Sequence, residues 1–262
     1  MNKNVFHNNF LAMNTRMDVI LWGDVQEKME SVFCSITACA EQLEKTLSRF
    51  NPDAETYLLN QALHKGGAFK PSAVLTEVIA KCEQYFQMTK AYFDVCYQNR
   101  TASSIWPIQF TADGTCKSIQ AGIQIDFGAI GKGIVLQEVD TILRENCIEN
   151  ALISFGESSI LTRGKHPHGE YWPFAFQNNM GIDSVLELNN DCLSISGLHN
   201  DVAHIVNPIN QQLITEPLGV CVQTDNAMDA EVLSTTLIAA PKNQHEEILA
   251  AFNIKKLLYS DS

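Results

Sequence analysis

Residues 126–133 read DFGAIGKG and join two different patterns. The apolar run at 123–127 predicts a strand ending in a carboxylate, and the apolar spacing at 131–146 predicts an amphipathic helix. Glycines let a ligand approach the backbone, a helix N-terminus offers N–H groups to an anion, and Lys132 adds a charge suited to phosphate. The same turn is also a common tight connection, and it matches neither a Walker loop nor a dinucleotide-binding fingerprint. Taken locally, both interpretations stay open.

The remaining pattern alternates helices with short strands on both sides of this turn. Apolar residues at helical spacing predict helices over 25–47 and 72–90. Further helices are predicted over 227–239 and 243–252. Short apolar runs predict strands over 10–22, 105–110, 151–155, 172–177, 185–188, 193–196, 203–206 and 218–223. This order is typical of an α+β fold, with sheets flanked by helices. No repeat or linker interrupts it, so we expect a single composite domain over 1–262.

Charge and cysteine content exclude several classes of partner. The net charge of -12 argues against binding to nucleic acid or to an anionic membrane surface, which both require a cationic face. The eight cysteines show no zinc-type spacing and predict free thiols in a reducing compartment. The N-terminus has neither a signal peptide nor a lipoprotein motif, and no apolar run is long enough to be inserted in a membrane. As written, the chain is expected in the cytoplasm; a trimmed leader would place it outside.

Two further segments carry residues suited to chemistry. Glu231 and Thr235 are four residues apart and share one face of the predicted helix 227–239, where a carboxylate and a hydroxyl can bind a hard cation such as Mg²⁺. The alternative is an acidic first turn that only favours the helix dipole. The segment 194–197, SISG, and His204 place hydroxyls and an imidazole near strand ends. A histidine there is suited to act as a general base or to border a ligand, or it is structural.

In order along the chain, these segments resemble the signature blocks of the ApbE family, which transfers FMN from FAD to a protein threonine or serine. The opening AMNT at 12–15 resembles AMGT, 47–55 resembles STYxPxSE, and Phe93-Asp94 resembles the FD block. The segment 126–133 resembles D-x-G-[GA]-I-x-K-G, and 150–156 resembles NALVNLGG. The segments 196–197, 204–208 and 227–237 resemble STSG, HIIDP and AxxADALATAL.

The resemblance implies a T-fold-like ApbE domain, FAD as substrate, Mg²⁺ as cofactor, and an acceptor protein with a Thr/Ser flavinylation motif. It implies roles for three groups of residues. Catalysis falls to Lys132, His204 and Glu231. FAD is bordered by Met13, Phe50, Tyr92, Phe93, Asp94, Asp126, Lys132, His204 and Ile205. Mg²⁺ is held by the Ala129 carbonyl, Glu231 and Ser234 or Thr235.

Several positions depart from the family pattern. Asn14 stands for a glycine, Glu157-Ser158 for the last two residues of GGD, and Glu231 for the usual aspartate. The additional methylene of Glu231 shifts a cation that prefers near-octahedral geometry at about 2.0–2.1 Å, unless the helix moves or Asp229 contributes. Two alternatives to the transferase therefore stay open. One is a non-catalytic FAD-binding homologue, and the other is an FAD pyrophosphatase that releases FMN and AMP.

Overall fold

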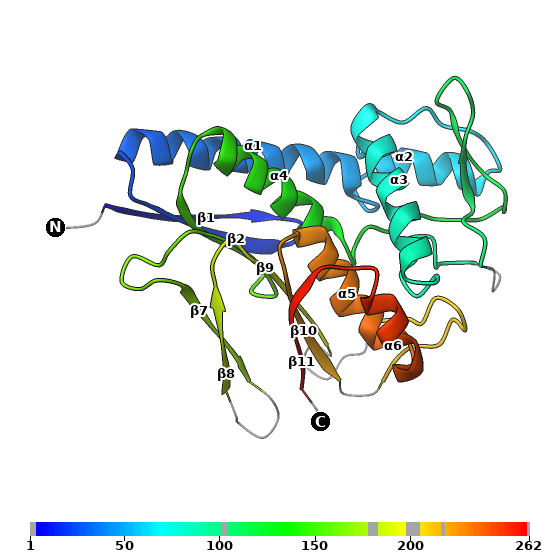
Figure 1. The fold of residues 1–262 in the computed structure, drawn as a ribbon. Coiled ribbons are helices and arrows are strands. Elements are labelled where there is room, and N and C mark those ends of the chain that lie inside the picture. Colours follow the sequence, from blue (N-terminus) through cyan, green and yellow to red (C-terminus); the bar gives the residue numbers. More distant parts are fainter. Residues whose placement is uncertain (1–3, 101–103, 178–182, 198–204, 216–217, 261–262) are drawn as a thin grey trace.

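The computed structural model describes residues 4–100, 104–177, 183–197, 205–215 and 218–260. They form an α+β architecture around one seven-stranded sheet, as predicted (Figure 1). The strand order is β1-β2-β5-β6-β9-β10-β11, and every adjacent pair is antiparallel. The bounds are β1 Val5–Ala12, β2 Thr15–Trp22, β5 Asn150–Phe155, β6 Ser159–Arg163, β9 Cys192–Ser196, β10 Gly219–Thr224 and β11 Ile254–Ser260.

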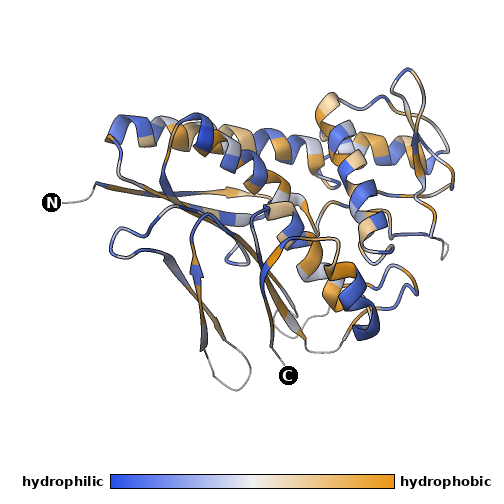
Figure 2. Ribbon diagram, viewed as in Figure 1, coloured by the Kyte–Doolittle hydropathy of each residue, from blue (hydrophilic) through white to orange (hydrophobic). Residues whose placement is uncertain are grey.

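Helices cover one face of this sheet, and a β-hairpin covers part of the other. The helices are α1 Gln26–Leu47, α4 Gly131–Glu145 and α5 Ala227–Ala239. Hydrophilic and hydrophobic residues alternate along α1, as expected for a helix with one exposed face (Figure 2). The hairpin of β7 Trp172–Gln177 and β8 Asp183–Leu188 packs Trp172 and Leu186 with Ile160 and Leu193 of the sheet.

A third group of elements lies at one end of α1. It contains α2 Glu55–His64, α3 Ala73–Met88 and the short pair β3 Ile108–Phe110 and β4 Cys116–Ser118. The last helix, α6 Lys242–Leu249, follows α5 and leads into the edge strand β11. None of the helices in the described ranges combines the length and apolar character needed to cross a bilayer. All eight cysteines are free thiols in this structure.

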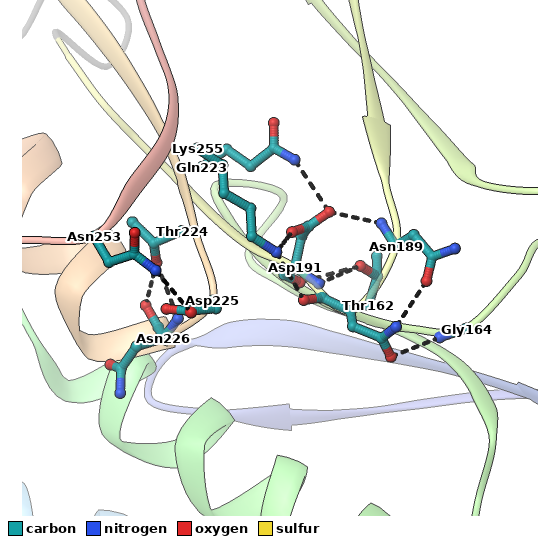
Figure 3. A network of polar contacts seen from close by, with 11 residues as sticks. Thr162, Gly164, Asn189, Asp191, Gln223, Thr224, Asp225, Asn226, Asn253 and Lys255 are labelled. Carbon is teal, nitrogen blue, oxygen red and sulfur yellow. Dashed lines mark hydrogen bonds and ion pairs between the residues drawn. The ribbon is translucent and has the colours of Figure 1, made fainter.

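A buried carboxylate links the strands β9, β10 and β11 at one edge of the sheet (Figure 3). Asp191 precedes β9 and is 4% exposed. Its Oδ2 accepts hydrogen bonds from the Asn189 backbone N–H at 2.7 Å and from Gln223 Nε2 at 3.1 Å, and Lys255 Nζ pairs with Oδ1 at 2.5 Å. The network therefore links the start of β9 to β10 and β11. Its partners explain how the carboxylate is tolerated in the interior without any catalytic role.

The predicted long helices are confirmed almost to the residue, and several predicted strands are wrong. The segment 10–22 is a hairpin, because Met13 and Asn14 adopt left-handed φ values of 49° and 59° that turn the chain. The segment 105–110 is a strand only from Ile108. The predicted strand 203–206 falls partly outside the described residues, and Val206 makes only an isolated bridge to Leu213. Sequence reasoning missed α2, β4, β6 and β11.

The segment 123–127 is not a strand, although its apolar residues Ile123, Ile125 and Phe127 are buried. A side chain takes the place of a neighbouring strand: Asn60 Nδ2 donates to the Ile125 carbonyl at 2.9 Å, and the Ile125 N–H donates to Asn60 Oδ1 at 2.8 Å. The Asp126 N–H donates to the Val95 carbonyl at 2.8 Å. One buried asparagine on α2 thus holds the backbone that leads into the glycine-rich turn.

Replacing Asn60 by leucine is expected to destabilise the protein by about 2–5 kcal/mol, because it leaves two buried peptide groups without partners at about 1–3 kcal/mol each. Urea unfolding followed by circular dichroism measures the change. Asn60→Asp keeps an acceptor for the Ile125 N–H but replaces the donor to the Ile125 carbonyl by a buried charge, so its free energy of unfolding should also fall. Wild-type stability for Asn60→Leu would contradict this role of Asn60.

The helices α4 and α5 approach each other at Gly133. A Cβ atom built there would lie 2.9 Å from both the Ala227 carbonyl oxygen and Glu231 Cγ, and 3.1 Å from Met228 Cα. Two of these neighbours are backbone atoms that cannot rotate away. Only a glycine therefore allows this packing, which brings the turn at 126–133 close to Glu231.

Gly133→Ala is expected to lower the free energy of unfolding by about 1–2 kcal/mol, since the overpacking cost exceeds the gain in helix propensity. Gly131→Ala is the matched control in the same helix, because its Cβ would meet Met13 Sδ at an ordinary 3.5 Å. We expect the control to be neutral or slightly stabilising in thermal and urea unfolding. Equal effects of the two substitutions would show that the α4–α5 contact is not tight.

Candidate functional site

A cleft of about 850 Å³ opens where the N-terminus of α4, one face of α5 and the end of β9 meet. Its volume lies within the range of about 300–1,000 Å³ that is usual for ligand pockets. The wall combines charged side chains, hydroxyls and apolar groups. Predicted site residues that line it are Tyr92, Phe93, Asp94, Asp126, Ala129, Lys132, Ile205, Glu231 and Thr235. The structure therefore brings together in one cleft residues separated by more than half of the chain.

A side pocket of about 300 Å³ adjoins this cleft and contains two further predicted residues, Met13 and Phe50. The two cavities share Arg49, Asp126 and Lys132 among their lining residues. Met13 lies in the turn between β1 and β2, and its N–H donates to Glu44 Oε2 at 3.1 Å. Phe50 is 69% exposed, and the Arg49 guanidinium lies 4.3 Å from its ring centroid.

The turn at 126–133 is built around the Asp126 carboxylate. Its Oδ1 accepts the Gly128 N–H at 2.9 Å, and its Oδ2 lies 3.1 Å from Arg49 Nε. Helix α4 then begins at Gly131 with no side-chain cap. The N-terminus of α5 differs, because Asn226 accepts the N–H groups of Met228 and Asp229. An uncapped helix N-terminus at a cleft is suited to bind an anion.

Lys132 supplies the cationic group of the cleft. Its Nζ donates to Ser158 Oγ at 2.5 Å. The partner is a neutral hydroxyl in the turn after β5, so the ammonium charge is not cancelled by this contact. Sequence comparison singled out Ser158 only as a departure from the family pattern, and its contact with Lys132 was missed.

Glu231 is buried, with 5% exposure, and faces the cleft from α5. Its Oε1 accepts hydrogen bonds from Ser159 Oγ at 2.5 Å and from Ser194 Oγ at 2.7 Å. Ser159 was not predicted as a site residue, whereas Ser194 belongs to the candidate segment 194–197. They come from β6 and β9 and are direct partners in the sheet register, a relation that no local sequence pattern reveals.

The hydroxyls of Ser234 and Thr235 differ in their access to the cleft. Ser234 is fully buried, whereas Thr235 lines the cleft together with Ser196. Asp229, suggested as a substitute for Glu231, points elsewhere: its Oδ1 accepts the Tyr85 hydroxyl at 2.6 Å, and burial raises its pKa. Glu231 and Thr235 are therefore the α5 side chains that offer oxygen to the cleft.

The segment 92–95 forms another part of the wall. Tyr92 is half-buried and Phe93 is buried, so they present aromatic surface. The Asp94 carboxylate pairs with Arg100 Nη1 at 2.5 Å, and both side chains are 2% exposed. Burial raises the pKa of Asp94, and the Arg100 charge opposes that shift. The ion pair directs this carboxylate toward Arg100, so its role is chiefly structural.

His204 lies outside the described residues, and Ile205 borders the cleft.

Hard oxygen donors in the cleft fit a small cation better than a transition metal. In the described part of the chain no three His, Cys, Asp or Glu side chains gather as a metal centre. The candidate oxygen donors are the Glu231 carboxylate, the Thr235 hydroxyl and the Ala129 carbonyl, because the Asp94 and Asp126 carboxylates are paired with arginines. Mg²⁺ commonly takes one or two carboxylates and completes its shell with water and substrate phosphates. The donor set is thus compatible with Mg²⁺ bound together with a phosphate ligand.

Comparison with known proteins gives one consistent result. The family model described as "ApbE family" matches residues 13–258. The FAD:protein FMN transferase of Klebsiella pneumoniae (strain 342) is 27% identical over 168 residues, covering 57% of this chain and 52% of that protein. The one of Chlamydia muridarum (strain MoPn / Nigg) is 25% identical over 142 residues, covering 50% and 43%. The chain spans about half the length of the curated relatives it matches.

Solved structures share the fold over almost the whole chain. The flavin transferase ApbE from Vibrio cholerae superposes with a TM-score of 0.82 at 16% identity, over 98% of this chain and 93% of that one. The apo form of the flavinyl transferase ApbE from Pseudomonas stutzeri gives a TM-score of 0.80 at 21% identity, over 95% and 87%. At these identities the similarity establishes the fold.

Proposed function

The chain belongs to the ApbE family, and from this premise we propose that it is an FAD:protein FMN transferase. It would transfer FMN from FAD to a Thr or Ser hydroxyl of an acceptor protein and release AMP. The observation that carries the proposal is the convergence of Lys132, Glu231, Thr235 and the uncapped start of α4 on one cleft. Together these groups suit a ligand that carries a pyrophosphate next to a larger aromatic part.

We propose that the pyrophosphate lies between the N-terminus of α4 and Lys132. Backbone N–H groups and the ammonium there stabilise the negative charge that increases on the phosphate oxygens during transfer. Tyr92, Phe93 and Ile205 provide apolar surface for the aromatic rings of FAD. Met13 and Phe50 extend that surface in the side pocket. Asp126 contributes by fixing the turn, because its oxygens are already engaged by Gly128 and Arg49.

Mg²⁺ would be held by the Ala129 carbonyl, the Glu231 carboxylate and Thr235 Oγ1. When bound, such a cation neutralises phosphate charge and orients the oxygens around the reacting phosphorus. Ser234 is the weaker candidate, because its hydroxyl is buried among other hydroxyls. The choice of Thr235 rests on its place in the cleft wall.

In the proposed reaction the acceptor hydroxyl oxygen bonds to the phosphorus on the riboflavin side. The bond between that phosphorus and the bridging oxygen breaks, and the bridging oxygen leaves with AMP. The hydroxyl proton passes to a base, for which the sequence offers His204. The residues of the chain contribute by position and charge, and no covalent enzyme intermediate is required.

Release of AMP from FAD, followed by chromatography, tests this proposal. The assay compares samples with Mg²⁺ and with EDTA, and samples with and without a peptide carrying the acceptor motif. Metal-dependent AMP together with a peptide mass increase of one FMN is the expected result. Metal-dependent AMP with an unmodified peptide would replace the proposal with an FAD pyrophosphatase. FAD binding without AMP release, even with peptide and metal, would leave only a non-catalytic flavin binder.

A further inference from the structure

The Glu231 carboxylate has two unequal oxygens. Oε1 accepts the hydroxyls of Ser159 and Ser194, which are 0% and 2% exposed. In the described ranges no hydrogen bond reaches Oε2, although the residue lines the cleft. A buried carboxylate is costly unless its lone pairs are satisfied. The arrangement satisfies one oxygen from the sheet and leaves the other for a ligand.

The serine hydroxyls continue beyond Glu231 as a chain. Ser194 Oγ lies 3.0 Å from Ser234 Oγ. Ser196 Oγ is the next member, 2.8 Å from Ser234 Oγ and 3.3 Å from Thr235 Oγ1. An ionised carboxylate only accepts, and each hydroxyl has a single proton. Ser194 gives its proton to Glu231, so it must accept from Ser234. The same rule makes Ser196 donate to Ser234 and Thr235 donate to Ser196.

The direction of these hydrogen bonds leaves the lone pairs of Thr235 Oγ1 free to face the cleft. Thr235 is the last member, and its proton points to Ser196, so its oxygen lone pairs remain available to the cleft. Ser234 Oγ also donates to the Glu231 backbone carbonyl at 3.1 Å, so its single proton is shared between that carbonyl and Ser194 Oγ. Glu231 Oε2 and Thr235 Oγ1 are thus both acceptors on the same side of α5, as a cation requires.

We propose that Ser159 and Ser194 are positioning residues for a cation at Glu231 and Thr235. They hold Oε1 against the sheet, which takes up the additional methylene of the glutamate and turns Oε2 to the cleft. Ser194 also orients the hydroxyl chain that ends at Thr235. This inference rests on the proposed function, because it assigns the serines to the same cation site.

The test measures binding of Mn²⁺, as the probe for Mg²⁺, through the electron paramagnetic resonance signal of the free ion. Samples contain full-length protein and FAD without acceptor, with a protein-free FAD sample as the blank. Ser159→Ala/Ser194→Ala is expected to weaken Mn²⁺ binding about 10–100-fold, as the loss of groups that orient a metal ligand does. Each single variant should lie between the double variant and wild type. FAD affinity in EDTA should stay unchanged.

Thr236→Val is the matched control. Thr236 is on the same helix, is fully buried, and its hydroxyl has no hydrogen-bond partner among the described residues. Wild-type Mn²⁺ binding is expected for this variant. Equal weakening by Thr236→Val would overturn the inference, because softening of α5 would then explain the loss. Circular dichroism confirms folding, and the single variants decide the matter if the double variant is unfolded.

Two other outcomes separate this inference from the proposed function. Wild-type binding in the folded serine variants would overturn the positioning role while leaving the transferase and its metal site standing. Failure of the wild-type protein to bind Mn²⁺ would overturn both the cation site and the role of the serines. The AMP assay still distinguishes these cases, because it reports turnover and not metal affinity.

Discussion

Glu231→Gln is expected to lower metal-dependent AMP release from FAD by at least about a hundredfold, since loss of the only cleft carboxylate on α5 removes several kcal/mol of cation-mediated charge stabilisation. Glutamine keeps the length of the side chain and can still accept hydrogen bonds from Ser159 and Ser194. The loss would therefore report charge and not packing. Initial rates of AMP formation over a range of Mg²⁺ concentrations measure the effect.

The same substitution should not destabilise the fold. Glu231 is buried, so its desolvation opposes folding, and a neutral amide of equal size reduces that cost. We expect a thermal midpoint equal to or above that of the wild type, the usual exchange of stability for function. Asp229→Asn is the matched control, because this carboxylate of the same helix is bound to Tyr85 and lies outside the cleft. Wild-type turnover in Glu231→Gln would remove the cation site from α5.

Local periodicity was sufficient to predict most of the helices. The stripes of α1, α3 and α4 repeat at helical spacing over enough residues to be unambiguous, whereas α5 is buried on nearly all sides and shows no such stripe. Short strands were harder to predict. The run at 123–127 has the composition of a buried strand, but its hydrogen bonds go to Asn60 and to the Val95 carbonyl. A side chain about 65 residues away decided that outcome, and no local pattern contains it.

In the candidate site, too, some residues could be predicted from the sequence and others depend on contacts between distant segments. Lys132 and Glu231 became candidates through their sequence context, and the resemblance supplied their pairing. Their convergence depends on Gly133, which lets α4 and α5 approach to distances that any Cβ would prevent. The segment 194–197 was a candidate, but its contact with Glu231 and the role of Ser159 could not be predicted, because Ser159 and Ser194 meet through strand register. Serines are common, and only the buried carboxylate between them gives these two a function.

Lys132→Met is expected to lower AMP release from FAD by about 10²–10³-fold. A fall of this size is typical for the loss of one group that stabilises developing charge. Methionine keeps an unbranched side chain of similar length, so the apolar part of the wall is preserved. The fall should persist at saturating Mg²⁺, because the lysine acts directly on the phosphates. Lys165→Met, which removes an exposed lysine paired with Glu170 on the loop after β6, is the control and should retain the wild-type rate.

Ser158→Asp, which restores the aspartate of the GGD block of the family at this position, tests the same charge without touching the lysine. Ser158 Oγ accepts from Lys132 Nζ, so a carboxylate at this position would form an ion pair with the ammonium. An ammonium paired in this way offers less net charge to a phosphate, and the added carboxylate repels it. We therefore expect weaker FAD binding in EDTA, measured by quenching of flavin fluorescence, whereas Ser158→Asn should bind FAD nearly as the wild type does. Equal binding by the aspartate and asparagine variants would mean that the Lys132 charge does not reach the ligand. In that case the fall in Lys132→Met would have to arise from the shape of the cleft.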